Sequence, residues 1–322
     1  MSQVFPAILE RKVLPKVWGG RVLETELGLT LPPQEAIGES WELYDRPGES
    51  SRLRGSEITL ADLMRDHRED VLGRGVRAGH GGHFPLLVKY IDARERLSVQ
   101  VHPGDEQAEE EDDAGKTEAW VVLHAGPQAK IVKGLRRGTT REEFEKVAAS
   151  AAVEQHLASF VPVASQAVFV PWGTVHAVGP DVVLYEIQQN SDVTYRLWDW
   201  GRPRETHLAK GLRAIRYDLP AEATHTPEPI AGGGEWLVKC PLFRVRRFAL
   251  LAPCVLGTEG SFKILSVLSG SGTVGWRSGG RHEPLLVRSG DTVLVPAVTG
   301  SVFVSPVGGL SILWADGGEE KR

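Results

Sequence analysis

Short apolar runs, rich in β-branched and aromatic residues and bounded by Gly, Pro or Ser, recur along the chain of 322 residues. This pattern is typical of β-strands that are joined by turns. Apolar residues at helical spacing are rare. They predict helices at 60–72, at 140–160, where Thr140 would cap the first turn, and at 204–215. The sequence therefore predicts a mainly β fold with a few short helices.

Two sequence patterns occur once before and once after the segment 217–235. EAWVVLHAGP at 118–127 aligns with KILSVLSGSG at 263–272, and AVFVPWGTVH at 167–176 aligns with TVLVPAVTGS at 292–301. The order and spacing of the two matches agree. This agreement predicts a duplicated antiparallel β-barrel.

The segment 217–235 is rich in Pro, Gly and Ala, which is typical of a linker. It separates the two copies of the repeated pattern. We therefore expect one domain at 1–218, a linker at 219–235 and a second domain at 236–322.

Charge and cysteine content narrow the function classes. The chain has 37 Lys and Arg against 42 Asp and Glu, a net charge of -5 and a pI near 6.1, so it offers no basic footprint for nucleic acid. Cys240 and Cys254 fit neither a zinc knuckle nor a disulfide framework. No stretch has the pattern of a signal peptide or a membrane span. We expect a cytoplasmic protein that binds neither nucleic acid nor membranes.

Three segments concentrate polar side chains that could bind a metal ion or transfer a proton. Strand alternation, or a tight turn, would bring these residues to one side of a sheet, facing a barrel interior. They are Ser98, Gln100 and His102 in LSVQVHP, Lys116 and Glu118 in GKTEAW, and His176 in VPWGTVH.

Four of these residues could form the shell of one zinc ion: Gln100, His102, Glu118 and His176. Imidazole nitrogen and carboxylate oxygen suit zinc, whereas the amide of Gln100 is an unusual ligand. A lone histidine near a strand end is usually an ordinary polar residue, but the combination is harder to dismiss. In the repeat alignment Glu118 is matched with Lys263, and His176 is matched with Ser301. We therefore expect the metal in the N-terminal half, with one ion per chain.

The stretch 186–202, EIQQNSDVTYRLWDWGR, has two interpretations. It could be a surface hairpin with cross-strand ion pairs, each of which contributes little. Alternatively, it could be the floor of a pocket in which Arg196 offers a bidentate fork to an oxyanion or phosphate.

Two further patterns are discounted. The run DEQAEEEDD at 105–113 is expected to be a solvated loop or helix start that points away from an anionic substrate. The glycine pattern GSGTVG at 270–275 is not followed by a helix signal, so we interpret it as a β-turn rather than a dinucleotide site.

Several blocks of the chain resemble the signature blocks of type I mannose-6-phosphate isomerases in their short bacterial form. They are VWGG, GESWEL, PLLVKYIDARERLSVQVHP, GKTEAW, VPWGTVHAVG and EIQQNSDVTYRLWDWGR, in this order between residues 17 and 202. The resemblance implies a zinc-dependent enzyme with two cupin-like antiparallel β-barrels, the second degenerate. It further implies interconversion of mannose 6-phosphate and fructose 6-phosphate through an enediol.

The resemblance also implies residue roles. Gln100, His102, Glu118 and His176 would bind zinc, Arg196 would be the essential arginine, and Lys89, Lys116, Glu186 and Asp192 would be pocket residues. We expect Ser98, on the ligand strand, to contact the substrate. Lys116 and Glu186 are both candidates for the base that transfers the proton.

Two rival functions stay open at this point. Another metal cupin, such as a phosphoglucose isomerase or a dioxygenase, usually has His-x-His where this chain has Gln100-Val101-His102. A non-catalytic sugar-binding cupin would not need Lys116, Glu118, Arg196 and a metal set together.

Overall fold

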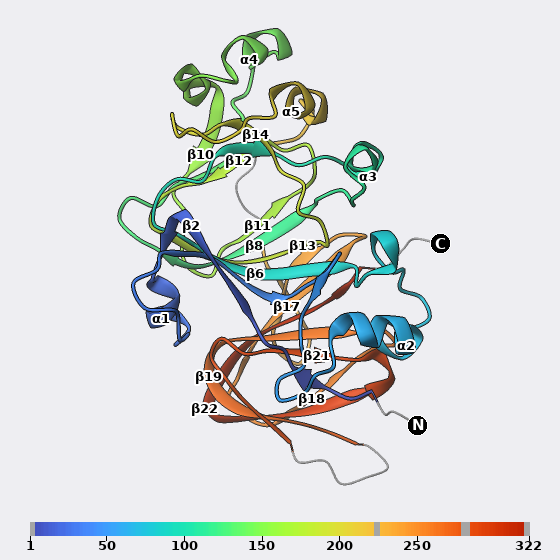
Figure 1. The fold of residues 1–322 in the computed structure, drawn as a ribbon. Coiled ribbons are helices and arrows are strands. Elements are labelled where there is room, and N and C mark those ends of the chain that lie inside the picture. The colour runs from blue at the N-terminus through green and yellow to red at the C-terminus, as the bar shows by residue number, and fades with distance from the viewer. Residues whose placement is uncertain (1–3, 222–225, 278–283, 319–322) are drawn as a thin grey trace.

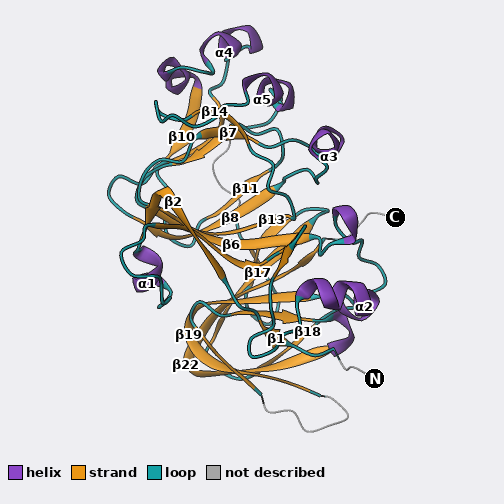
Figure 2. Ribbon diagram, viewed as in Figure 1, coloured by secondary structure: helices purple, strands orange, loops and turns teal. Residues whose placement is uncertain are grey.

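The computed structural model describes residues 4–221, 226–277 and 284–318, and nearly all of its strands belong to three stacked sheets (Figure 1). A six-stranded sheet lies in the middle. A five-stranded sheet lies above it in the view, and a nine-stranded sheet formed mainly by the C-terminal part lies below. The mainly β fold is confirmed, with its few short helices at the periphery (Figure 2). Within the described ranges, no helix has the length and apolar character needed to span a bilayer.

The middle sheet separates the candidate site from the C-terminal part. Its strands, in spatial order, are β11 (Ala167–Val170), β8 (Glu118–Ala125), β13 (Val182–Gln189), β6 (Leu86–Ala93), β2 (Lys12–Gly20) and β3 (Ile37–Leu43). Strand β13 is buried along its whole length because both of its faces are covered. Tyr185 and Ile187 pack toward the C-terminal sheet, whereas Glu186 points to the opposite side, as the two-residue period of a strand requires.

The upper sheet carries two of the predicted ligand segments. Its strands, in spatial order, are β10 (Leu157–Phe160), β9 (Ile131–Leu135), β12 (His176–Val178), β7 (Val99–Val101) and β14 (Tyr195–Trp198). A small separate hairpin pairs β4 (Asp45–Arg46) with β5 (Glu49–Ser50).

The C-terminal sheet is organised around two long strands. Its members are β1 (Ala7–Ile8), β21 (Thr292–Val295), β19 (Lys263–Trp276), β22 (Ser301–Gly317), β17 (Phe243–Leu250), β16 (Glu235–Lys239), β15 (Glu228–Pro229), β18 (Cys254–Gly257) and β20 (Leu285–Arg288). Strand β1 comes from the N-terminus and pairs with β21. Strand β15 lies in the segment expected to be a linker, of which residues 222–225 are outside the described residues.

The expected closed barrels are not confirmed. Over the described residues the strand order of no sheet returns to its first strand, although β3 of the middle sheet also pairs with β6. Alternation of polar and apolar residues shows which face of a strand is buried, but it does not show whether a sheet closes on itself.

The helices are α1 (Val22–Glu26), α2 (Leu60–Leu72), α3 (Asp105–Ala108), α4 (Arg141–Val147) and α5 (Leu208–Ala214), with 3₁₀ turns at His80–Gly82, Glu109–Glu111, Ala151–His156 and Ala297–Thr299. The prediction at 60–72 is confirmed. The prediction at 140–160 has the right start, because Thr140 and Glu143 form a capping box. However, the helix ends after two turns, and the chain continues as the 3₁₀ turn and β10. The third helix begins only at Leu208, and Arg204, where it was expected to begin, binds Asp199 instead.

The sequence repeat corresponds to a structural repeat. On β8, Glu118 pairs with Val170 of β11, and on β19, Lys263 pairs with Val295 of β21. These are the positions that the sequence alignment matches. The glycine pattern at 270–275 lies within β19, so its interpretation as a β-turn was wrong.

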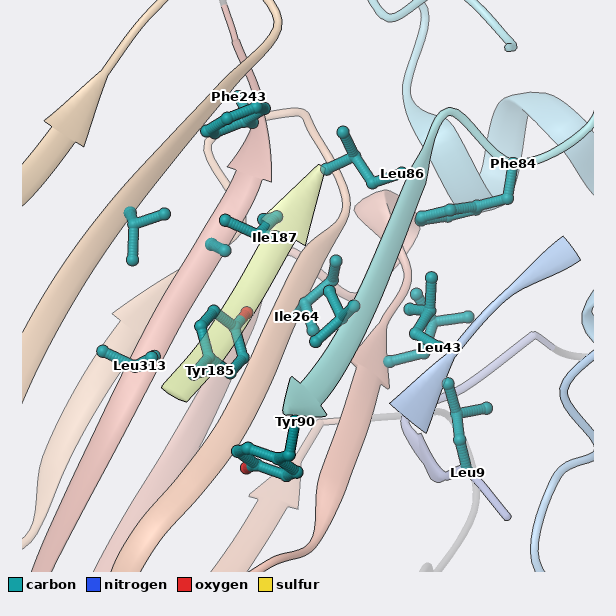
Figure 3. Close-up of a cluster of buried hydrophobic side chains, with 14 of the residues drawn as sticks. Leu9, Leu43, Phe84, Leu86, Tyr90, Tyr185, Ile187, Phe243, Ile264 and Leu313 are labelled. Carbon is teal, nitrogen blue, oxygen red and sulfur yellow. The ribbon is translucent and has the colours of Figure 1, made fainter. Parts of the chain in front are cut away.

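A continuous apolar core joins the middle sheet to the C-terminal sheet (Figure 3). Tyr185 and Ile187 of β13 pack in one cluster with Phe243 of β17, Ile264 of β19 and Leu313 of β22. The C-terminal sheet thereby covers the face of the middle sheet opposite to the predicted ligands, which stabilises the strands that carry them.

Candidate metal centre and adjoining cavity

A buried group of two imidazoles and one carboxylate lies where the upper and middle sheets face each other. His102 directly follows β7, His176 begins β12 and Glu118 begins β8. One ligand atom from each side chain lies within 4.8 Å of the other two. Nε2 of His102 is 3.5 Å and Nε2 of His176 is 3.3 Å from the Glu118 carboxylate. Three of the four expected ligands therefore converge.

Gln100, the fourth expected ligand, lies beside this group. It pairs with His176 across β7 and β12, and its Nε2 is 3.0 Å from Nε2 of His176. Ser98 donates a hydrogen bond to Oε1 of Gln100 at 3.3 Å. A half-turn of the amide would direct its oxygen toward His176, so Gln100 is within reach of a shared ion.

Each imidazole is oriented by a backbone carbonyl on its far side. Nδ1 of His102 lies 2.9 Å from the Val193 oxygen, and Nδ1 of His176 lies 2.9 Å from the Thr174 oxygen. A carbonyl only accepts hydrogen bonds, so Nδ1 of the neutral ring carries the proton and the Nε2 lone pair faces Glu118. Metal-binding histidines are commonly held by such contacts.

The protonation states also suit metal binding. Burial, with Lys116 nearby, lowers the pKa of His102 to about 3, and burial also lowers the pKa of His176. Burial alone would raise the pKa of Glu118, but the positive charge of Lys116 is the largest opposing effect, and the pKa lies well below its usual value. Both Glu118 oxygens are buried and lack a well-aligned hydrogen bond from the described residues. Neutral imidazoles and an ionised carboxylate are the donor set that a divalent transition metal requires.

Two lysines and a second carboxylate lie next to the metal-capable group. Nζ of Lys116 is 3.1 Å from Glu118 and 3.2 Å from Nε2 of His102. Oε1 of Glu186 is 3.1 Å from Nζ of Lys89 and 3.8 Å from Nζ of Lys116. These contacts bring together Lys89, Lys116 and Glu186, which the sequence analysis selected from three different strands or loops.

Glu186 has an unusual electrostatic environment. Burial and the negative charge of Glu118 raise its pKa, and the neighbouring lysines offset only part of this effect. Trp120, which faces Glu186 across β8 and β13, donates a 2.9 Å hydrogen bond from Nε1 to Oε2 of Glu186. The sequence analysis did not select Trp120, because its contact depends on the pairing of two strands far apart in the sequence.

Residues of β2 and β3 form the wall beyond Lys89, and the sequence analysis assigned them no role. Lys16 and Trp18 line the cavity from β2, and Glu39 lines it from β3. Burial raises the pKa of Glu39, but Lys89 and Lys16 more than compensate and lower it to about 2. The signal that could have identified these residues was their place in or beside the VWGG and GESWEL blocks.

Arg196 and Arg204 provide the cationic end of the cavity. Arg196 lies on β14 opposite Gln100, and its Nη1 donates to the Glu205 carbonyl at 2.7 Å. Asp199 binds Arg204 through both of its oxygens, at 2.5 and 2.7 Å, and also accepts from Arg202. The stretch 186–202 thus contains local ion pairs, as the hairpin interpretation expected. It also lines the cavity, which agrees with the interpretation as a pocket floor.

The cavity that adjoins the metal-capable group has a volume of about 280 Å³. Its lining contains more cationic than anionic side chains, which favours an anionic ligand. The charged and polar lining residues are Lys16, Glu39, Lys89, Ser98, Gln100, Lys116, Glu186, Asp192, Thr194, Arg196 and Arg204. It therefore contains every catalytic or substrate-binding residue proposed from the sequence.

The acidic run 105–113 does not contribute to this lining, in agreement with its expected orientation. Most of its carboxylates are exposed on α3 and the following 3₁₀ turn. Asp113 is the exception, because it is buried in an ion pair with Arg46.

Comparison with known proteins places the chain among sugar-phosphate isomerases. The family model "Phosphomannose isomerase type I, catalytic domain" matches residues 7–117. A mannose-6-phosphate isomerase of Streptococcus mutans is 33% identical over 305 residues, covering 90% of this chain and 92% of the relative. The mannose-6-phosphate isomerase ManA of Bacillus subtilis is 33% identical over 294 residues, covering 87% and 90%.

The fold is also similar to that of a solved mannose-6-phosphate isomerase. The crystal structure of the mannose 6-phosphate isomerase from Bacillus subtilis superposes with a TM-score of 0.85 at 28% identity, covering 97% of this chain and 99% of that one.

Proposed function

Because the chain belongs to the type I phosphomannose isomerase family, we propose that it interconverts mannose 6-phosphate and fructose 6-phosphate. The observation that carries this proposal is the adjacency of two features. The His102–Glu118–His176 group lies beside a cavity whose lining combines a carboxylate of raised pKa with arginines suited to a phosphate. A non-catalytic sugar-binding protein has no need of the carboxylate.

We propose zinc as the resident ion, one per chain, held by His102, Glu118, His176 and the amide oxygen of Gln100. Imidazole and carboxylate donors match zinc. Because the Nδ1 atoms of both histidines donate to backbone carbonyls, the Nε2 lone pairs can bind the ion. When bound, zinc would act as a Lewis acid that stabilises negative charge on a substrate oxygen.

Glu186 is our choice for the group that moves the proton. In the open-chain aldose it would take the proton from C2, while the C–H electron pair forms the C1–C2 double bond of an enediol and O1 gains a proton. Return of the proton to C1, with loss of the proton on O2, gives the ketose. A raised carboxylate pKa brings the base closer to neutral pH, where proton transfer is efficient. Lys116, the second candidate, lies against the metal ligands and would stabilise charge there.

The phosphate would be bound by Arg196 and Arg204 at the cationic end of the cavity. Asp199 fixes Arg204 in a bidentate pair, so the arginine is held in place before substrate arrives. Lys89, Ser98 and Asp192 would contact the sugar hydroxyls from the cavity wall. All of these residues belong to 1–218, and we propose that 236–322 serves to bury the back of the middle sheet.

Exchange of hydrogen with solvent at substrate C2 tests the function directly. The purified chain, loaded with zinc, is incubated with mannose 6-phosphate in D₂O while a coupled assay follows fructose 6-phosphate. We expect one zinc per chain, turnover, and deuterium at C2 of recovered mannose 6-phosphate. Zinc binding without turnover would favour a sugar-binding cupin, and turnover of glucose 6-phosphate alone would favour a phosphoglucose isomerase.

A further inference from the structure

The buried ion pair between Arg46 and Asp113 lies outside the cavity. The pair nevertheless contacts a chain segment that lines the cavity. Nη1 and Nη2 of Arg46 donate to the two carboxylate oxygens of Asp113 at 2.9 and 2.6 Å. The Arg46 and Asp113 side chains are 16% and 10% exposed, so solvent screens the pair only weakly. By contrast, the side chains of Glu110 and Arg213, which pair from the same acidic run, are both more than half exposed.

Both partners also bind the backbone of the turn 190–193, which is part of the connection between β13 and β14. Nη1 of Arg46 donates to the Asn190 carbonyl at 2.6 Å, and Asp113 accepts from the Asp192 amide at 3.2 Å. The ion pair thus makes one hydrogen bond to a backbone carbonyl of this turn and one to a backbone amide two residues later. A turn that is bound on both sides loses much of its freedom to shift along the sheet.

Residues of the turn 190–193 contact the cavity and the metal-capable group at one point each. The Asp192 side chain lines the cavity, and the Val193 carbonyl accepts from Nδ1 of His102 at 2.9 Å. The position of the Val193 oxygen decides which way the His102 ring faces, and therefore where its Nε2 lone pair points.

We propose that Arg46 and Asp113 are positioning residues: their ion pair fixes the turn 190–193 and so places the Asp192 carboxylate in the cavity and orients His102 toward Glu118. This proposal rests on the proposed function for its kinetic consequences, but its effect on metal affinity does not depend on that function. It also explains why one carboxylate of an otherwise solvated acidic run is buried.

The test compares Asp113→Ala and Arg46→Lys with Glu110→Gln, a control in the same acidic run. The full-length proteins are titrated with Zn²⁺ against a competing chelator, and the visible spectrum of each Co²⁺-loaded protein is recorded. Loss of a group that orients a metal ligand typically weakens metal affinity by about 10-fold or more. We expect this loss and an altered Co²⁺ spectrum in Asp113→Ala, a smaller change in Arg46→Lys, and no change in Glu110→Gln.

Kinetics on mannose 6-phosphate at saturating zinc provide the second readout. Asp113→Ala and Asp192→Ala should each raise KM, and the double variant should be no worse than Asp192→Ala alone, because the carboxylate that Asp113 places is then already absent.

The proposal is overturned if metal affinity stays within about twofold of wild type and the two KM effects multiply. If Asp113→Ala does not fold, unchanged metal affinity and KM in Arg46→Lys and Asp113→Asn overturn it equally. A wild-type protein that binds zinc but shows no turnover would refute the proposed function instead, and the metal titration would still decide the positioning role.

Discussion

Lys263 occupies on β19 the position that Glu118 occupies on β8, and each pairs with the matching valine of the neighbouring strand. The same structural position thus holds a metal-capable carboxylate in one half and an ammonium group in the other. Lys263 is fully buried and lies 2.6 Å from Asp316 of β22. At this position the C-terminal half has an ion pair where the N-terminal half has a metal-capable carboxylate.

Replacing this ammonium group tests its structural role. In the variant Lys263→Met, Asp316 would keep its ion pair with Arg244 at 2.8 Å. The free energy of unfolding should therefore fall by about 3 kcal/mol, the lower end of the range for a broken buried ion pair. Urea unfolding of the metal-free protein measures this loss. Zinc stoichiometry should be unchanged, and the exposed pair of Lys239 with Glu228 offers a control, since Lys239→Met should cost less than about 1 kcal/mol. A reduced zinc content in Lys263→Met would contradict a purely structural role.

Arg196→Ala should abolish most of the turnover while zinc remains bound. The guanidinium lines the cavity and binds the Glu205 carbonyl, and it makes no described contact with the His102–Glu118–His176 group. Loss of a charged anchor that acts in the transition state should lower kcat/KM by about 100-fold, or about 3 kcal/mol. Steady-state kinetics with parallel zinc analysis check this. Arg213→Ala, at an exposed pair, should behave as wild type. Near-wild-type kcat/KM in Arg196→Ala would show that Arg196 does not have the proposed role in binding the phosphate.

The residues that we propose as metal ligands could be selected from the sequence because strand alternation is a local property. Ser98, Gln100 and His102 share a face wherever their strand is placed. The carbonyls of Val193 and Thr174, which orient the histidines, carry no sequence signal, because any residue can supply a carbonyl. Their role appears only when distant segments meet.

The errors in the predicted elements have a similar origin. No glycine or proline ends the helix predicted at 140–160; the pairing of Leu157–Phe160 with β9 extends the chain there. Gly270 has φ of +85°, and a Cβ atom at this position would lie 2.1 Å from the Gly309 oxygen. The glycine pattern therefore permits close approach of β22 at an irregularity in the pairing, not a turn.

Glu186→Gln should lower kcat by about 10²- to 10⁴-fold, because the amide cannot accept the proton from C2. Zinc content should stay at the wild-type level, since Glu186 is not among the proposed ligands. In the wild type the base is active when ionised, so activity falls as the pH drops through its pKa. Because burial raises that pKa, the acid limb of kcat/KM should lie above the ordinary carboxylate value of 4.5. An acid limb at or below that value would argue against Glu186 as the base.

Trp120→Phe should move this acid limb to higher pH without removing activity. The indole donates to Oε2 of Glu186, and a hydrogen bond to the ionised form lowers a carboxyl pKa. A hydrogen bond to a charged group contributes about 1.5 kcal/mol, so its loss should raise the pKa by about 1 unit. A profile of kcat/KM against pH, measured at saturating zinc, gives the shift. Trp236→Phe in the C-terminal sheet should leave the profile unchanged, since its ring packs against Lys239 and Arg246 and does not line the cavity. If the acid limb does not move in Trp120→Phe, a group other than Glu186 sets it, and Lys116 becomes the next base to test.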